Sequence, residues 1–271
     1  MSFIAVLSEN DMLIGSDDTK RQITATGAQR NRAPHPGKQY SRAMRPEAEA
    51  LVRSATAPAA VPFVPEVMLL TAAEPFGLWD RTERDAPPFW AFPWAGGQGL
   101  ARYLLDHPEA VAGRSVLDVA SGSGLVAIAA AKAGARTVTA GDIDEHALAA
   151  IALNADANNA PQVTARRVDL AATWDEGRPG SAPGVAATSA SIVCAPDVVL
   201  AADVFYQREL AAMALAFLNA ARRAGAIVLA ADPGRAFVPI AALVPVASYE
   251  IPVLAVLEDA SAKTVTVYRL P

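Results

Sequence analysis

The stretch Val116-Leu-Asp-Val-Ala-Ser-Gly-Ser-Gly124 joins an apolar run to two closely spaced glycines. The apolar run Ser115–Val119 predicts a buried strand, and the alanine-rich residues that follow the glycines as far as Ala133 predict a helix. Gly122 and Gly124 let the backbone turn sharply and approach a ligand that a Cβ would hold away. The stretch therefore predicts a strand, a tight ligand-binding turn and the start of a helix.

Strand and helix patterns alternate through the rest of the chain. The predicted strands are Ser115–Val119, Thr137–Ala140, Val163–Val168, Val198–Ala202 and Ala226–Ala231; the predicted helices are 124–133, Glu145–Ala157, Arg208–Arg222 and one near Ala236–Leu243; Val244–Ile251 and Thr264–Leu270 predict a closing hairpin. Alternating strands and helices form right-handed βαβ units. We therefore expect an α/β protein with a Rossmann-like, doubly wound, mostly parallel seven-stranded sheet and a C-terminal antiparallel hairpin strand. Ligands of such sheets bind at the carboxyl ends of the strands.

The composition of the chain changes near Met44. The predicted divisions are a disordered basic extension (1–43), a helix and strand segment that covers the active site (44–110) and a core (111–271). Ser16–Ala43 is basic and has almost no large apolar residue, so it cannot offset its ordering entropy; a docked basic arm is the alternative. Within the other divisions we expect a helix at Pro46–Ser54, an extended segment at Val61–Leu70, helical spacing over Gln98–His107 and a long loop at Trp174–Ala195.

Charge and residue counts exclude several classes of protein. The 271 residues carry a formal net charge of −5, which argues against a protein that coats nucleic acid or an anionic membrane. A single cysteine, Cys194, excludes an intrachain disulfide and a CxxC motif, and the three histidines lie far apart, so no metal is expected. No apolar run reaches the roughly eighteen residues that span a bilayer, and residues 1–14 lack a basic secretory leader. We expect a cytoplasmic monomer without nucleic-acid or membrane partners.

The glycine turn is compatible with more than one cofactor. Gly122-x-Gly124-x-x-Ala127 fits a dinucleotide fingerprint, and Asp142, at the end of the next predicted strand, can bind both hydroxyls of a ribose. A dinucleotide would place its pyrophosphate close to the Asp118 carboxylate, which is unfavourable. S-adenosylmethionine carries an ammonium and a sulfonium and has no phosphate, so the two acidic residues favour it. A glycine turn that only packs the helix on the sheet is the third interpretation.

The same residues resemble a known superfamily. Val116–Gly124 and Gly141-Asp-Ile-Asp144 are similar to the motif I and post-I signatures of class I methyltransferases, which carry no information on the substrate. This resemblance implies a Rossmann-like class I methyltransferase fold and S-adenosyl-L-methionine as cofactor. The superfamily usually has glycine where this chain has Ala120. We expect that alanine to narrow the turn slightly without abolishing binding.

From Val61 to Pro271 the chain resembles the lysine methyltransferases of the electron-transfer flavoprotein beta subunit and their bacterial relatives. The segments that carry this resemblance are 88–98 (PFWAFPWAGGQ), 102–108 (RYLLDHP), 203–206 (DVFY) and 231–235 (ADPGR). The DxFY element is specific to a small group of protein methyltransferases. The resemblance implies a protein-lysine N-methyltransferase whose protein substrate is that flavoprotein subunit. The chain departs from the family pattern in its N-terminal extension and in Trp174–Ala195, and neither departure touches a motif.

The strand ends and the resemblance together give a cofactor-binding set. Its members are Trp94, Asp118, Ala120, Ser121, Gly122, Gly124, Asp142, Asp169 and Ala202. Asp169 ends the third predicted strand and is expected at the adenine amino group, with a polar turn as the alternative. Trp94 resembles the tryptophan that lies against the methionine part of the cofactor, where an indole face suits a sulfonium. Trp90 and Phe92 are pocket or core residues, and Trp174 is a candidate cover for the adenine.

Asp203 and Tyr206 are the catalytic candidates. Asp203 follows the predicted strand Val198–Ala202, where its carboxylate can hold a lysine amine in line with the methyl group. Tyr206 can orient the same nitrogen with its hydroxyl. The alternative is structural: Asp203 caps the helix that starts at Arg208, and Tyr206 packs against the first turn of that helix. Arg235 is expected to bind an acidic stretch of the substrate or to brace its loop, and no residue is identified as the general base.

Other functions stay open on the sequence alone. A small-molecule N-methyltransferase, of nicotinamide type or with another amine acceptor, would use Phe89, Trp90 and Trp94 to line a closed aromatic pocket. It should have a lidded cavity, whereas a protein methyltransferase should have an open rim. A non-catalytic cofactor-binding protein is disfavoured because both catalytic candidates are present. A nicotinamide oxidoreductase is disfavoured by Asp118.

Overall fold

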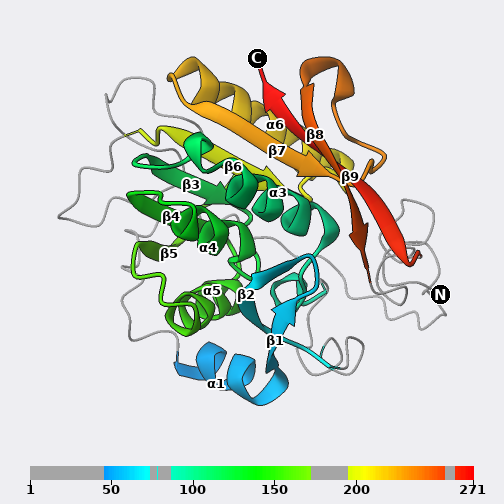
Figure 1. Ribbon diagram of the computed structural model, residues 1–271. Coiled ribbons are helices and arrows are strands. Elements are labelled where there is room, and N and C mark those ends of the chain that lie inside the picture. The colour runs from blue at the N-terminus through cyan, green and yellow to red at the C-terminus, as the bar shows by residue number, and fades with distance from the viewer. Residues whose placement is uncertain (1–45, 74–77, 79–86, 172–194, 254–259) are drawn as a thin grey trace, which may run out of the picture.

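A seven-stranded sheet forms the centre of the molecule. The computed structural model describes residues 46–73, 78, 87–171, 195–253 and 260–271 (Figure 1). The strands of the sheet are β3 (Ser115–Val119), β4 (Thr137–Asp142), β5 (Val163–Arg167), β6 (Val198–Ala202), β7 (Ile227–Asp232), β8 (Val244–Pro252) and β9 (Ala262–Leu270). The predicted extension (1–43), Trp174, Cys194 and nearly all of the predicted loop Trp174–Ala195 lie outside the described residues.

The strand order is β5-β4-β3-β6-β7-β9-β8. Strands β3 to β7 pair in parallel, β9 pairs antiparallel with β7, and β8 pairs antiparallel with β9. The predicted fold, a mostly parallel seven-stranded sheet with a C-terminal antiparallel hairpin, is therefore confirmed. The parallel strands all point the same way, so the residues that end β3, β4, β6 and β7 meet at one edge of the sheet.

Helices cover both faces of this sheet, since successive residues of a strand point to opposite sides. The helices are α1 (Pro46–Ala55), α3 (Ala95–Asp106), α4 (Leu125–Lys132), α5 (Glu145–Ala157) and α6 (Arg208–Arg223), with short 3-10 turns at Phe89–Ala91, Pro108–Ala110 and Ile240–Ala242. Val116, Val198 and Leu200 share a buried cluster with α3, α4 and α5. Leu117 and Val199 share the opposite cluster with α6. None of the helices in the described ranges has both the length and the apolar character needed to cross a membrane.

The helix predicted near Ala236–Leu243 is wrong, because this segment contains only the 3-10 turn Ile240–Ala242. Pro239 lies in the middle of the predicted helix, where it lacks the N–H that a helix interior needs and clashes with the preceding turn. The extended segment Val61–Leu70 is confirmed in part: β1 (Ala57–Val61) and β2 (Val64–Thr71) form an antiparallel hairpin, and the turn between them was not predicted.

Two asparagines, one in α5 and one at its C-cap, bind this hairpin to the rest of the molecule. Asn154 is fully buried; its side chain accepts the N–H of Leu70 at 2.8 Å and donates to the carbonyl of Ser123, also at 2.8 Å. Asn158, one helical turn on, accepts the N–H of Met68 and donates to its carbonyl. Figure 1 shows the hairpin and α1 beside α5, at the opposite end of the sheet from β8. The side chain of Asn154 therefore links the hairpin to the glycine turn.

We expect Asn154→Ala to lower the free energy of unfolding by about 2–4 kcal/mol. The substitution leaves a buried N–H and a buried carbonyl unsatisfied, each at a cost of about 1–3 kcal/mol, and it opens a small void. Urea denaturation measures the change. Asp156→Ala, an exposed position on the same helix, is the matched control and should stay close to the wild type. Equal stability of both variants would contradict the bridging role of Asn154.

Candidate functional site

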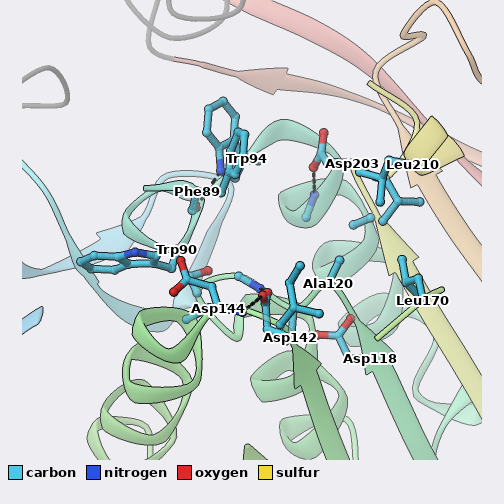
Figure 2. Close-up of a pocket in the computed structure, with 18 of the residues that line it drawn as sticks. Phe89, Trp90, Trp94, Asp118, Ala120, Asp142, Asp144, Leu170, Asp203 and Leu210 are labelled. Carbon is cyan, nitrogen blue, oxygen red and sulfur yellow. Dashed lines mark hydrogen bonds between the residues drawn. The ribbon is translucent and has the colours of Figure 1, made fainter. Parts of the chain in front are cut away.

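A cavity of about 430 Å³ opens at the carboxyl edge of the sheet (Figure 2). It lies between the ends of β3, β4 and β6 and the aromatic segment that leads into α3. Of the residues predicted from sequence, Trp94, Asp118, Ala120, Ser121, Gly122, Asp142, Asp169, Ala202, Asp203 and Tyr206 all line it. Gly124 lies in the adjoining turn and does not itself line the cavity. The structure thus gathers nearly the whole predicted set around one space.

The glycine turn after β3 depends on left-handed backbone. Ala120, Gly122 and Gly124 have φ angles of 50°, 54° and 84°. Glycine adopts this region freely, whereas the Cβ of Ala120 is sterically unfavourable there. This accounts for the glycine that the superfamily usually has at that position. The turn is closed by hydrogen bonds from Gly124 N–H to the Ser121 carbonyl and from Ser121 N–H to the Gly141 carbonyl, both 2.9 Å.

Asp142 links the glycine turn to the end of β4. Its Oδ2 accepts the N–H of Gly122 at 2.9 Å, and its Oδ1 accepts the N–H of Asp144 at 3.0 Å (Figure 2). Asp144 in turn caps α5 by accepting the N–H of His146. Burial raises the pKa of the Asp142 carboxyl above its usual value. The carboxylate therefore holds the turn and the helix start together while it lines the cavity.

Asp118 is an ionisable group buried beneath the turn. It is 1% exposed and accepts a hydrogen bond of 2.5 Å from the Ser121 hydroxyl. The pKa of Asp118 is raised to about 7, mainly by burial and to a smaller extent by the charge of Asp142, while the hydrogen bond from Ser121 acts in the opposite direction. A cationic ligand close to Asp118 would favour its ionised form, whereas a phosphate would oppose it.

We expect Asp118→Asn to raise the free energy of unfolding at pH 8 by about 2–4 kcal/mol and to change it little at pH 4. Between the unfolded pKa near 4 and the folded pKa near 7, the native state binds more protons, so stability falls as pH rises through this window. The variant lacks that loss. Urea denaturation of both proteins from pH 4 to pH 8 measures the difference in the free energy of unfolding. Because Asp142 and Asp232 are present in both proteins, their titration cancels and the difference reports Asp118. A difference that does not vary with pH would show that folding does not raise the pKa of Asp118.

Aromatic side chains form the wall opposite the turn. Trp94 starts α3 and donates from Nε1 to the Phe89 carbonyl at 2.8 Å. The Phe89 ring lies 5.7 Å from Trp94 and 5.4 Å from Tyr206, centroid to centroid. Trp90 and Phe92 belong to a buried cluster and also line the cavity, so both of their predicted roles coexist. The aromatic wall thus extends from Trp94 to the catalytic candidate Tyr206.

Asp203 does not cap α6, because the residue at the start of that helix is Gln207. The structural alternative offered for Asp203 is therefore wrong. Its Oδ2 accepts the N–H of Gly97 in the first turn of α3 at 2.8 Å (Figure 2), and its Oδ1 accepts from Arg235 at 3.1 Å. Arg235 thus ties its loop to the end of β6, while its two predicted roles, binding an acidic stretch of the substrate or bracing its loop, stay predictions. Asp203 lines the cavity with its carboxylate held between a helix N-terminus and a guanidinium.

Tyr206 and Asp169 also lie at the cavity. Burial raises the pKa of Tyr206 to about 12, so its hydroxyl stays protonated at neutral pH and does not serve as a base there. The Asp169 carboxylate accepts the N–H of Ala171 at 2.9 Å, as a turn residue would, and it also lines the cavity. Its role toward a ligand stays a prediction.

Part of the apolar lining was not predicted from the sequence, including Ile143, Leu170, Leu210 and Met213. Ile143 is 55% exposed. A signal was available for two of them, since Ile143 and Leu170 each directly follow an aspartate at a strand end. Among the described residues there is also no group of three or more His, Cys, Asp or Glu side chains that could hold a metal ion.

Comparison with known proteins adds sequence relatives. The family model for ribosomal protein L11 methyltransferase (PrmA) matches residues 103–194. Electron transfer flavoprotein beta subunit lysine methyltransferase from Danio rerio is 35% identical over 176 residues, 64% of this chain and 61% of that protein. The Xenopus laevis protein of the same name is 35% identical, over 65% of each chain. The chain thus matches less than two thirds of the length of these relatives.

The comparison with solved structures gives matches of low TM-score and low sequence identity. A ribosomal protein L11 methylase from Lactobacillus delbrueckii subsp. bulgaricus is 16% identical with a TM-score of 0.44, covering 78% of this chain and 98% of that one. The sequence relatives, together with the strand order and the glycine turn after β3, give this chain the class I methyltransferase fold. The resemblance stated from the sequence motifs is confirmed.

Proposed function

We propose that this chain is an S-adenosylmethionine-dependent protein-lysine N-methyltransferase and that its substrate is the electron-transfer flavoprotein beta subunit. The observation that carries the proposal is the shared cavity: Asp203 and Tyr206 line the same space as the glycine turn and Asp142. An amine at Asp203 and a cofactor at Asp142 would therefore meet inside one pocket. The relatives named for that flavoprotein subunit support the choice of substrate.

The cavity suits S-adenosylmethionine better than a phosphate-bearing cofactor. Its volume of about 430 Å³ lies within the roughly 300–1,000 Å³ of small-molecule sites. The buried carboxyl of Asp118 and the half-buried Asp142 stand beside the glycine turn, where a dinucleotide would place its pyrophosphate. Ile143 and Leu170 offer apolar surface for a flat adenine, and Trp94 offers an indole for a sulfonium. When bound, S-adenosylmethionine supplies a methyl group on a positively charged sulfonium.

The residues around Asp203 would present the amine. A lysine side chain is an ammonium at pH 7, and its neutral form costs roughly 4 kcal/mol. The Asp203 carboxylate holds the incoming nitrogen by charge, and the Tyr206 hydroxyl fixes its direction, so that the nitrogen faces the cofactor side of the cavity. Phe89 and Trp94 place apolar ring surface beside this region, and an amine that gives up hydration against that surface loses its proton more easily, to the solvent at the mouth of the cavity.

Direct methylation tests the proposed function. The full chain is incubated with labelled S-adenosylmethionine and purified electron-transfer flavoprotein beta subunit, and the product is mapped by mass spectrometry. We expect a methylated lysine on the subunit. A parallel incubation replaces the subunit with the small-molecule extract of a lysate. Label that appears in that extract and never on the subunit would instead support the small-molecule N-methyltransferase.

We expect Asp142→Ala to weaken cofactor affinity by about 100-fold or more, which isothermal titration calorimetry measures. The change removes two ribose hydrogen bonds to a charged acceptor, each worth about 1.5–3 kcal/mol, and it also frees the Gly122 N–H. Asp156→Ala is the control, since it removes a carboxylate from the same region of the chain without touching the cavity. Unchanged affinity in Asp142→Ala would contradict the cofactor assignment.

We expect Asp203→Asn to keep cofactor affinity and to lower turnover on the beta subunit by about 100-fold or more. The amide preserves shape but loses the charge that attracts the amine, and mispositioning a reacting group acts on this scale. Rates are measured with saturating cofactor well below the melting temperature of the variant, beside Asp156→Asn as control. If Asp203 only stabilises the fold, the folded variant should turn over at the wild-type rate under these conditions, which would contradict the catalytic role.

We propose that residues 44–110 form the segment that covers the active site and that residues 111–271 form the methyltransferase core; the predicted extension, 1–43, lies outside the described residues. The protein acts in the cytoplasm as a monomer and has neither nucleic acid nor membrane as a partner. Size-exclusion chromatography with light scattering tests the monomer.

A further inference from the structure

The Asp203 carboxylate already has a cationic partner in this structure. Arg235 donates to Oδ1 at 3.1 Å, and the side chains of Asp203 and Arg235 are only 13% and 12% exposed. A lysine ammonium that approaches Asp203 therefore meets a guanidinium at the same carboxylate. Two cations on one carboxylate repel each other, so binding requires the guanidinium to share or leave its place.

Asp203 itself cannot move aside. Its backbone is left-handed, with φ 55°, and its N–H donates to the Ala231 carbonyl at 3.1 Å. At Gly96, in the first turn of α3, a Cβ would lie 2.6 Å from Asp203 Oδ2, so the helix packs directly on the carboxylate. Gly97 N–H holds the same oxygen. The long side chain of Arg235 is therefore the partner that can change position.

A second carboxyl stands next to Arg235 with an acceptor to spare. Asp232 ends β7 and is 0% exposed; its Oδ1 accepts the N–H of Gly234 at 2.8 Å and that of Arg235 at 2.6 Å. Its Oδ2 is buried and accepts no hydrogen bond. Such an atom is costly to keep, since a buried acceptor normally has a partner. It lies within electrostatic reach of both Asp203 and Arg235.

We propose that Asp232 and Arg235 are positioning residues, and that the Arg235 guanidinium moves from Asp203 to the buried Oδ2 of Asp232 when the substrate amine arrives. Asp203 is then free to bind the ammonium. With the ammonium present, the two carboxylates of Asp203 and Asp232 face two cations, the Arg235 guanidinium and the substrate, so the charges balance. This inference rests on the proposed function for its substrate, while the move of Arg235 between two carboxyls is testable without one.

The movement depends on the ionisation of Asp232. Burial, and after it the charge of Asp203, raises the pKa of Asp232 to about 7. Below that pH the protonated carboxyl attracts Arg235 less, so the guanidinium stays on Asp203. The charged groups that face Asp232 are Asp203 after β6 and Arg235 in its own loop; β9 pairs the uncharged Thr266 with it, and the first turn of α3 has no acidic side chain. We therefore expect kcat/KM for the protein substrate to fall as pH drops below about 7.

Kinetics of three variants test the proposal. Asp232→Asn keeps the shape and an oxygen acceptor but loses the charge; we expect kcat/KM for the beta subunit to fall about tenfold or more, with cofactor affinity unchanged. Arg235→Gln removes the competing cation. Asp232 acts only through Arg235, so its substitution should have no further effect once Arg235 is removed. The double variant should therefore have the same kcat/KM as Arg235→Gln, without the fall in kcat/KM below about pH 7. The proposal would be overturned if the two substitutions lowered kcat/KM additively and if Asp232→Asn kept the fall in kcat/KM below about pH 7.

Crystal structures of the wild type soaked with butylamine, which stands in for the lysine side chain, at pH 6 and pH 8.5 supply the independent test. We expect Arg235 to bond Asp203 and not Oδ2 of Asp232 at pH 6, and to reach Oδ2 of Asp232 at pH 8.5. An Arg235 that stays on Asp203 and away from Oδ2 of Asp232 at both pH values overturns the inference, whatever the protein substrate. A wild type that shows this movement but does not methylate the beta subunit would instead refute the proposed function and leave the movement standing.

Discussion

The carboxylate of Asp142 is the contact on which the arrangement of the site depends. It accepts one backbone N–H from the glycine turn after β3 and one from the start of α5. A turn with three left-handed residues in five is unfavourable in isolation, so it needs partners that fix each amide. Asp142 supplies one of these partners, and Asn154 of α5 supplies another through the Ser123 carbonyl. The ends of two strands and one helix are thereby locked around the cavity before any ligand binds.

Much of this arrangement could be predicted from the sequence, because it follows from periodicity and from position. The parallel strands are short apolar runs, and β3 and α5 have the predicted bounds. Parallel strands bring their carboxyl ends together, so Asp118, Asp142 and Asp203 had to lie near one another once the strands were placed. The glycines of the turn mark the left-handed positions directly, with Ala120 as the exception.

The features that were missed are set by contacts between segments distant in the sequence. The role of Asp203 as an N-cap of α6 was plausible locally, but its oxygens are bound by Gly97 and Arg235, which lie 106 and 32 positions away. The bonds of Asn154 reach the hairpin 84 positions away, and no local pattern distinguishes that asparagine from a surface one. The wrong helix near Ala236–Leu243 is a different case, since Pro239 was visible in the sequence and its steric effect was underweighted.

The missing side chain of Gly96 has a consequence for how selective the pocket can be. Because helix α3 rests on the Asp203 carboxylate without a Cβ in between, that carboxylate has lost its rotational freedom when the chain folds. The conformational entropy of this side chain is therefore lost on folding and is not lost again when a ligand binds. A carboxylate fixed in this way binds a cation strongly when the length and direction of the cationic side chain match its position, and weakly when they do not. Selectivity at this point of the pocket is thus a property of the backbone of α3.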